Sequence, residues 1–127
     1  MPVLLTLAMA GIAGAGGAAA EPALQGCSYT LSPPQVTQLS GTAVVTASVA
    51  MAACNRANAT LQVACIQMQG SGAAPLCVST EGPQTAQVFF TPYRPGAGYI
   101  ATGRGCANAG NPPTSVCHTV GPATATL

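Results

Sequence analysis

The sequence has very few charged residues and contains no lysine, aspartate or tryptophan. Charged residues make up 4% of the 127 positions, and the net charge is +1 at pH 7. So small a charge provides no electrostatic attraction for nucleic acid or for an anionic membrane surface. A Ser-His-acid triad or a carboxylate pair would have to use Glu21 or Glu81, the only two acidic side chains. We therefore expect no catalytic site and no enzyme activity.

The chain has a single histidine, His118. It shares alternate positions with Val116 and Val120, which predicts a partly buried structural side chain. A copper site made of His118 with Met51 or Met68 would have suitable ligand types, but no ligand spacing supports it. The cysteines form no Cys-x-x-Cys pair of the kind that zinc sites use. We expect neither a metal nor a cofactor.

The N-terminal segment has the character of an export signal. Residues 2–20 are apolar and small, and the alanines at 18–20 precede Glu21 in the small-x-small pattern of a signal-peptidase site. No lysine or arginine precedes the apolar run. The sequence predicts a signal peptide over residues 1–20 and a mature domain over residues 21–127.

Two other interpretations of this segment remain open. One is a membrane anchor that is not removed. The other is lipidation at Cys27, because residues 24–27 resemble a bacterial lipobox. With the signal cleaved, we expect no membrane span in the mature protein and a secreted or cell-surface location.

Residues 41–54 predict the longest β-strand, and the rest of the chain looks arranged to cover it. One set of alternate positions is apolar, as in a strand with one face on a core: Ala43, Val45, Ala47, Val49, Met51 and Ala53. The other set carries Thr46 and Ser48 and ends in Cys54, which places this cysteine on the more polar face.

Shorter strands and turns make up the rest of the mature chain. We expect strands over 28–39 (kinked by two prolines), 60–68, 77–80, 84–90, 99–106, 116–120 and 123–127. A turn over residues 55–58 precedes the strand 60–68. We expect no helix after residue 20. About seven short strands at regular intervals predict an all-β, antiparallel, immunoglobulin-like sandwich.

The strand over 60–68 has an irregular pattern. Leu61, Val63 and Cys65 share one face, whereas Ile66 and Met68 fall on the other. A β-bulge near Cys65 would restore the register. The alternative is a strand with both faces partly covered.

The six cysteines read as three disulfides, since export implies an oxidising compartment. Each sequential pair is symmetric about a turn-rich centre, as a bridged hairpin would be. This symmetry predicts the pairs Cys27–Cys54, Cys65–Cys77 and Cys106–Cys117. A rival arrangement joins Cys27 to Cys117 and Cys54 to Cys106.

Phe89, Tyr93 and Arg94 lie close together in the sequence among prolines. Aromatic and arginine side chains commonly anchor interfaces, so this group is the candidate binding surface. The alternative is that Phe89 simply covers the second face of its sheet. Asn58-Ala59-Thr60 also matches a glycosylation acceptor, a motif that often occurs by chance.

Residues 39–49, Leu-Ser-Gly-Thr-Ala-Val-Val-Thr-Ala-Ser-Val, together with a signal peptide and two bridged hairpins, resemble the small secreted immunoglobulin-like proteins of actinobacteria. Among these, the chain is similar to the neocarzinostatin family of chromophore-binding apoproteins. The resemblance implies a seven-stranded sandwich with two short-range disulfides. It implies no ligand, because this chain lacks tryptophan and has the additional pair Cys27 and Cys54.

The sequence therefore predicts an exported, non-enzymatic protein that binds a partner or serves as a surface or structural component. Its partner would be a protein or a component of the cell envelope. The alternative function is a carrier that holds an apolar small molecule in a cleft between the sheet and its cysteine hairpins.

Overall fold

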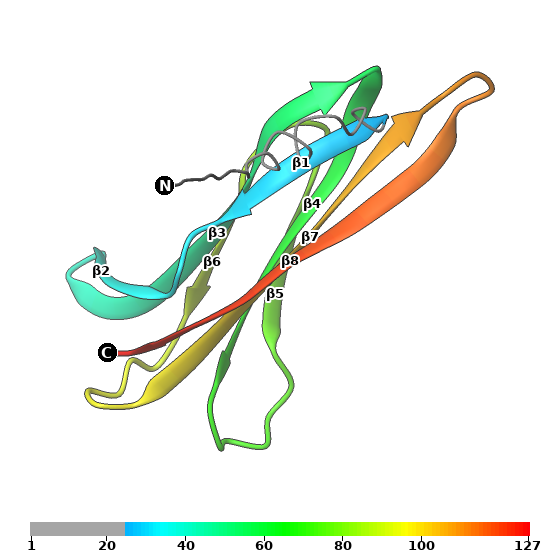
Figure 1. Ribbon diagram of the computed structural model, residues 1–127. Coiled ribbons are helices and arrows are strands. Elements are labelled where there is room, and N and C mark those ends of the chain that lie inside the picture. Colours follow the sequence, from blue (N-terminus) through cyan, green and yellow to red (C-terminus); the bar gives the residue numbers. More distant parts are fainter. Residues whose placement is uncertain (1–24) are drawn as a thin grey trace, which may run out of the picture.

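A computed structural model describes residues 25–127, which form eight β-strands and no helix (Figure 1). The strands are β1 (Gly26–Leu31), β2 (Gln35–Leu39), β3 (Thr42–Asn55), β4 (Ala57–Met68), β5 (Leu76–Glu81), β6 (Ala86–Phe90), β7 (Gly98–Ala109) and β8 (Thr114–Thr126). The predicted signal peptide and Glu21 lie outside the described residues.

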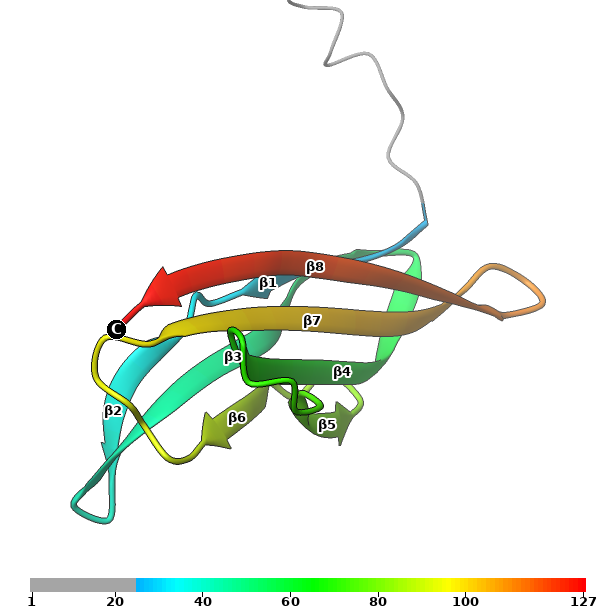
Figure 2. The same ribbon diagram turned by 90° about the horizontal axis from the view of Figure 1, so that it is seen from below.

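The strands form two antiparallel sheets that pack face to face (Figure 2). In the first sheet, β3 pairs with β1 and β2 along one edge and with β6 along the other. The second sheet has the order β5-β4-β7-β8. With β1 and β2 taken as two halves of one first strand, this order is that of an immunoglobulin-like sandwich. The predicted all-β sandwich is confirmed.

The first strand is divided by Ser32, Pro33 and Pro34, as the prolines predict. Proline has no N–H and cannot contribute a donor to the ladder. β1 pairs with the C-terminal half of β3 and β2 with its N-terminal half. At the break, the Ser32 N–H donates to the Ser48 carbonyl at 2.9 Å, and the Ser48 N–H donates to Ser32 Oγ at 2.8 Å. The kinked strand therefore stays attached to β3.

The core between the sheets consists mainly of small apolar side chains. On β3, Val45, Ala47 and Val49 are buried, as the alternation predicts. Two glycines on β7 provide the space for larger groups from the first sheet. A Cβ atom at Gly103 would overlap Val49, and one at Gly105 would overlap the ring of Tyr29. The missing side chains on β7 thus allow the two sheets to approach closely.

A bulge in β3 changes the face on which Cys54 lies. Tyr29 pairs with Met51 and Ser28 pairs with Ala53, so Ala52 has no partner on β1. One unpaired residue reverses the alternation that follows it. Cys54 therefore shares the inner face with Met51, and its partner Cys27 is buried within the core. The prediction that Cys54 lies on the polar face is wrong for this reason.

A second bulge lies in β4, but not near Cys65. The register with β7 shifts between Ala59 and Leu61, which leaves Thr60 as the extra residue. Gln62, Ala64 and Ile66 are fully buried and face the core. The outer face receives Leu61, Val63 and Cys65 instead. The register is regular from Leu61 to Met68, so the predicted bulge near Cys65 is absent. The alternative is confirmed: both faces of the strand are partly covered, because Ile66 is buried on the inner face and Leu61, Val63 and Cys65 are half-buried on the outer face.

Two connections differ from the predicted ones. The turn over residues 55–58 contracts to Arg56, whose φ of 53° lets the chain cross from β3 in the first sheet to β4 in the second. The predicted strands 116–120 and 123–127 join into one strand, β8. A register shift between Ala101 and Gly103 accommodates the Gly121-Pro122 interruption in this strand.

All three predicted disulfides are present, and the rival arrangement is excluded. Each joins two residues that lie directly opposite each other on paired strands, with Cα–Cα distances of 4.0 to 4.1 Å. Because Cys27 Sγ is bonded to Cys54, it is not available to carry a lipid thioether.

Candidate functional site

The described residues contain no metal-binding cluster. Within residues 25–127, no three His, Cys, Asp or Glu side chains are placed to hold a metal ion. His118 lies on β8 next to Gly26, and it is exposed. The prediction of a partly buried histidine is wrong, because His118 lies on the edge strand β8 and lines a depression that opens to solvent.

The three residues of the predicted binding surface have different surroundings. Phe89 pairs with Thr46 and lies half-buried on the outer face of the first sheet. Tyr93 packs against the core, and its hydroxyl donates to the Leu127 carbonyl at 2.9 Å. Arg94 has an exposed side chain, and its backbone N–H donates to the Tyr99 hydroxyl oxygen at 2.8 Å. Tyr93 thus has a structural role, and of the three residues Arg94 has the most exposed side chain.

One depression of about 290 Å³ opens at the end of the sandwich beside the Cys27–Cys54 disulfide. It lies where the β1–β3 pair meets β8. The lining residues are Gln25, Gly26, Cys27, Ser28, Ala53, Cys54, Asn55 and His118. Its volume reaches only the lower end of the range typical for small-molecule sites.

The outer face of the second sheet has a more distinctive composition. Residues paired across a sheet share a face, so the registers of β5, β4, β7 and β8 place three rows of side chains on this surface. The rows are Glu81, Leu61, Cys106 and Cys117; Ser79, Val63, Arg104 and Thr119; and Cys77, Cys65 and Thr102. We call this surface the cystine face, because it carries two of the three disulfides.

Each disulfide of the cystine face fastens an edge strand to an inner strand. Cys65–Cys77 joins β4 to β5, and Cys106–Cys117 joins β7 to β8. Between the two disulfides lie Leu61 and Val63 on β4, both half-buried. The face therefore has an apolar centre on a sheet whose two outer strands are covalently held.

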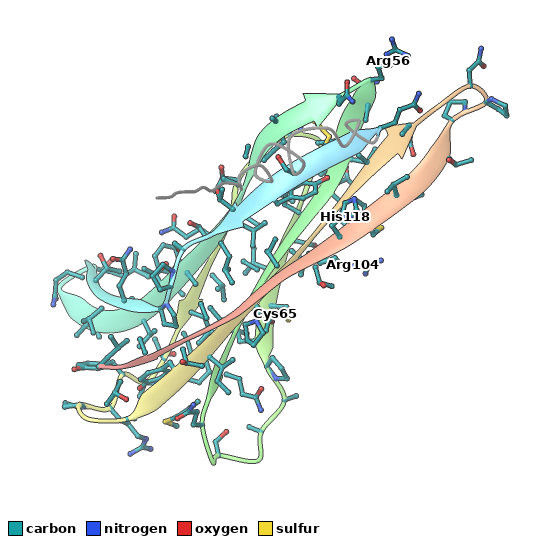
Figure 3. All side chains as sticks on the ribbon, viewed as in Figure 1. Arg56, Cys65, Arg104 and His118 are labelled. Atoms are coloured by element: carbon teal, nitrogen blue, oxygen red, sulfur yellow. A yellow bond between two sulfur atoms is a disulfide. The ribbon has the colours of Figure 1, made fainter. Side chains whose placement is uncertain are left out.

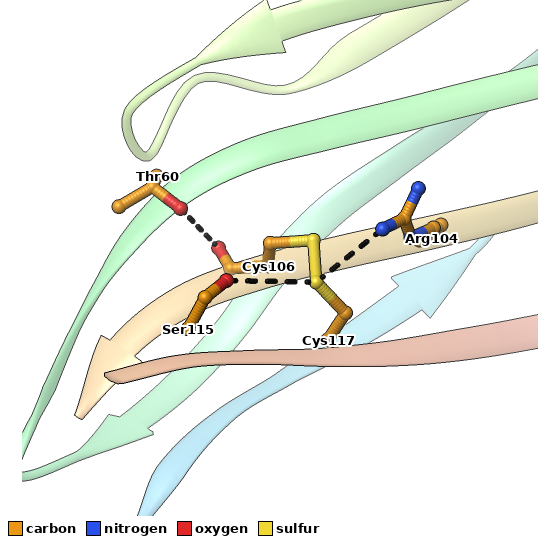
Figure 4. The surroundings of a disulfide bond; sticks show 5 residues. All are labelled: Thr60, Arg104, Cys106, Ser115 and Cys117. Atoms are coloured by element: carbon orange, nitrogen blue, oxygen red, sulfur yellow. Dashed lines mark hydrogen bonds between the residues drawn. A yellow bond between two sulfur atoms is a disulfide. The ribbon is translucent and has the colours of Figure 1, made fainter.

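Arg104 lies beside the Cys106–Cys117 disulfide (Figure 4). Its Nη2 donates to Cys117 Sγ at 3.5 Å, and Ser115 Oγ lies 3.9 Å from the same sulfur. Thr60 Oγ1 donates to the Cys106 carbonyl at 3.1 Å, so the bulge in β4 is tied to the same disulfide. Arg104 and Cys65, labelled in Figure 3, both belong to the cystine face.

Sequence reasoning missed this surface. The alternation of Leu61, Val63 and Cys65 was visible, but the position of the bulge decides whether these residues face the core or the solvent. Arg104 lies in a glycine-rich strand, and the sequence around it does not indicate which side chains lie next to it on the sheet. Only the register between β4, β5, β7 and β8 brings the cysteines and Arg104 together.

Comparisons with protein-family models, with curated proteins and with solved structures found no match for this chain. Within residues 25–127, there is no helix long and apolar enough to cross a membrane.

Proposed function

We propose that this protein is exported and acts without catalysis, as a binding protein or a structural component of the cell surface, through its cystine face. The observation that carries the proposal is the placement of two disulfides on one outer face around the half-buried Leu61 and Val63. A surface whose edge strands are covalently held loses little conformational freedom when a partner covers it. An apolar centre with a polar surround is the usual anatomy of an interface.

Two further observations support the proposal. Three disulfides in so small an all-β domain favour an oxidising compartment outside the cytosol. His118 on β8 and Glu81 on β5 lie at opposite edges of the second sheet, with β4 and β7 between them. They are too far apart for the histidine–carboxylate contact that a catalytic triad needs.

Site-specific photo-crosslinking in the native host tests the proposal. A benzophenone side chain at Val63 would sample the cystine face, and one at Gln35, which is exposed on the outer face of the first sheet, is the matched control. We expect cross-linked products from Val63 and none from Gln35. Equal products at both positions, or none from Val63, would contradict a function through this face. Mapping the disulfides of both variants checks that they fold.

The second candidate function is a carrier of an apolar small molecule, favoured by the depression beside the Cys27–Cys54 disulfide. Ala53 lines this depression and is exposed, so Ala53→Trp would fill it without entering the core. A carrier would show a rise in melting temperature with one class of apolar compound, and Ala53→Trp would abolish that rise. If no compound raises the melting temperature of the natural chain, the carrier function is ruled out.

A further inference from the structure

The cystine face carries one positive and one negative charge among the described residues: Arg104 on β7 and Glu81 on β5. Both side chains are exposed. Within residues 25–127 neither takes part in an ion pair, and the guanidinium of Arg104 is directed toward Cys117 on β8, away from β5. The partner of this face therefore has to accommodate two opposite charges at a set separation.

The register defines where these charges lie. Glu81 shares a row with Leu61, and Arg104 shares the next row with Val63. β4 lies between the strands that carry the two charges. With strands about 4.8 Å apart and rows about 7 Å apart, the two charges are separated by roughly 12 Å, too far for a direct ion pair. The midpoint of the line that joins them falls on β4, between Leu61 and Val63.

We propose that the partner of the cystine face is a second copy of this chain. Consider a two-fold axis that lies in the plane of the interface and passes through that midpoint, perpendicular to the Glu81–Arg104 line. Rotation about this axis exchanges the positions of the two charges. Arg104 of each copy then faces Glu81 of the other, and both ion pairs form together. Leu61 and Val63 of the two copies meet at the axis. This is the self-complementarity that a two-fold symmetric interface requires.

Charge complementarity favours a second copy over other occupants. A strongly basic or strongly acidic partner would leave one of the two charges facing its own sign, which is unfavourable once water is excluded. A purely apolar partner would bury both charges without a counter-charge. A second copy provides a counter-charge for both, with the apolar side chains in contact at the centre and the charges setting the orientation. The inference rests on the proposed function, because it names the partner of the same face.

Sedimentation of the oxidised chain over a range of concentrations tests the inference. We expect a concentration-dependent dimer. Arg104→Glu and Glu81→Arg should each raise the dissociation constant by at least about tenfold, because each places like charges opposite one another. The double variant R104E/E81R exchanges the charges and restores both pairs, so its dissociation constant should return to within about threefold of the original. Arg56→Glu, outside the face in the β3–β4 connection, is the control and should have no effect.

Disulfide mapping and circular dichroism establish that each variant is folded before its association is measured. A chain that stays monomeric at millimolar concentration overturns the inference, as does a dimer whose dissociation constant the double variant fails to restore. A monomer whose Val63 still cross-links to another molecule would leave the proposed function standing while excluding the dimer. A monomer with no cross-links from Val63 would remove both.

Discussion

The aromatic ring of Tyr29 lies directly against the backbone of Gly105, across the interior of the sandwich. Tyr29 projects from β1, whereas Gly105 lies on β7 of the opposite sheet. A Cβ atom at position 105 would overlap ring atoms Cε1 and Cζ. The tyrosine is 8% exposed, so the ring has no free volume into which it could move without disturbing the core. This contact sets the spacing of the two sheets at the β1 side.

Gly105→Ala should therefore destabilise the protein by about 1–3 kcal/mol, the usual cost of overpacking a core. Denaturant unfolding measures the loss. Gly98→Ala is the control on the same strand, because its Cβ would meet only the end of the exposed Gln69 side chain, which can turn away. Equal losses in the two variants would show that strand propensity, and not the contact with Tyr29, determines the effect.

Gln62 is a fully buried amide in the row of Gly105, and among residues 25–127 neither its Nε2 nor its Oε1 has a hydrogen-bond partner. An unpaired buried polar group costs free energy that an apolar group of similar shape does not. Gln62→Leu should leave the free energy of unfolding unchanged or raise it by about 1 kcal/mol.

Thr46→Val is the matched contrast to Gln62→Leu. The buried Thr46 hydroxyl donates to the Val88 carbonyl at 2.9 Å and accepts from Gln87 Nε2 at 3.1 Å. Loss of this hydroxyl in Thr46→Val should lower the free energy of unfolding by about 1 kcal/mol. A comparable loss in Gln62→Leu would mean that the amide forms hydrogen bonds in the folded protein. Urea unfolding at neutral pH measures both variants.

Burial raises the pKa of the Tyr29 phenol, because desolvation disfavours its anion. A group whose pKa is raised on folding contributes its full stability below its unfolded-state pKa, near 10 for tyrosine, and the contribution is lost as the pH rises toward the folded-state pKa. The stability of the natural chain should fall above about pH 10, by at most about 1.4 kcal/mol per pH unit from this group.

Tyr29→Phe tests the assignment. This variant cannot ionise at position 29, so its free energy of unfolding should fall less steeply than that of the natural chain between about pH 9.5 and pH 11. Urea unfolding at closely spaced pH values measures both slopes. Parallel slopes would show that another group causes the alkaline loss. The six described cysteines are all in disulfides, which limits exchange during the measurement.

Removal of the Cys27–Cys54 disulfide should be the most costly of the three. Its cysteines are 27 residues apart, against 12 and 11 for the other two pairs. The chain-entropy model gives about 3.5 kcal/mol for the long loop and about 2.8 kcal/mol for each short one. Cys27 also belongs to the core. Thermal unfolding of the three paired Cys→Ala variants gives the ranking, and a greater loss for either short loop would refute it.

Local sequence patterns were sufficient for much of the fold. The strands and the all-β class follow from the alternation of apolar residues and from turn residues, and the division of the first strand follows from its prolines. Each of these signals depends only on residues that are close together in the sequence. The three disulfides were also predictable, because each joins cysteines placed symmetrically about one turn-rich centre. A scarcity of charge was likewise visible from composition alone.

The faces of the strands were decided only by the tertiary structure. Side chains alternate with a period of two, so a single bulged residue reverses every assignment after it. Ala52 and Thr60 are such residues, and no residue type marks them as bulges. Cys54 turned to the inner face, at the exposed end of the strand, and Leu61 and Val63 lie on the outer face. The exposure of His118 likewise depends on the place of β8 at the edge of its sheet.

By itself the sequence determined a disulfide-stapled all-β chain, because strand propensity and hairpin closure are local. It did not determine a surface. The cystine face forms only when four strands pair in the correct register. Its two edge strands, β5 and β8, are not paired with each other. The separation of Arg104 from Glu81 is a property of that assembled sheet, because residues 23 positions apart in the chain are placed by pairing with β4 and not by their own neighbours.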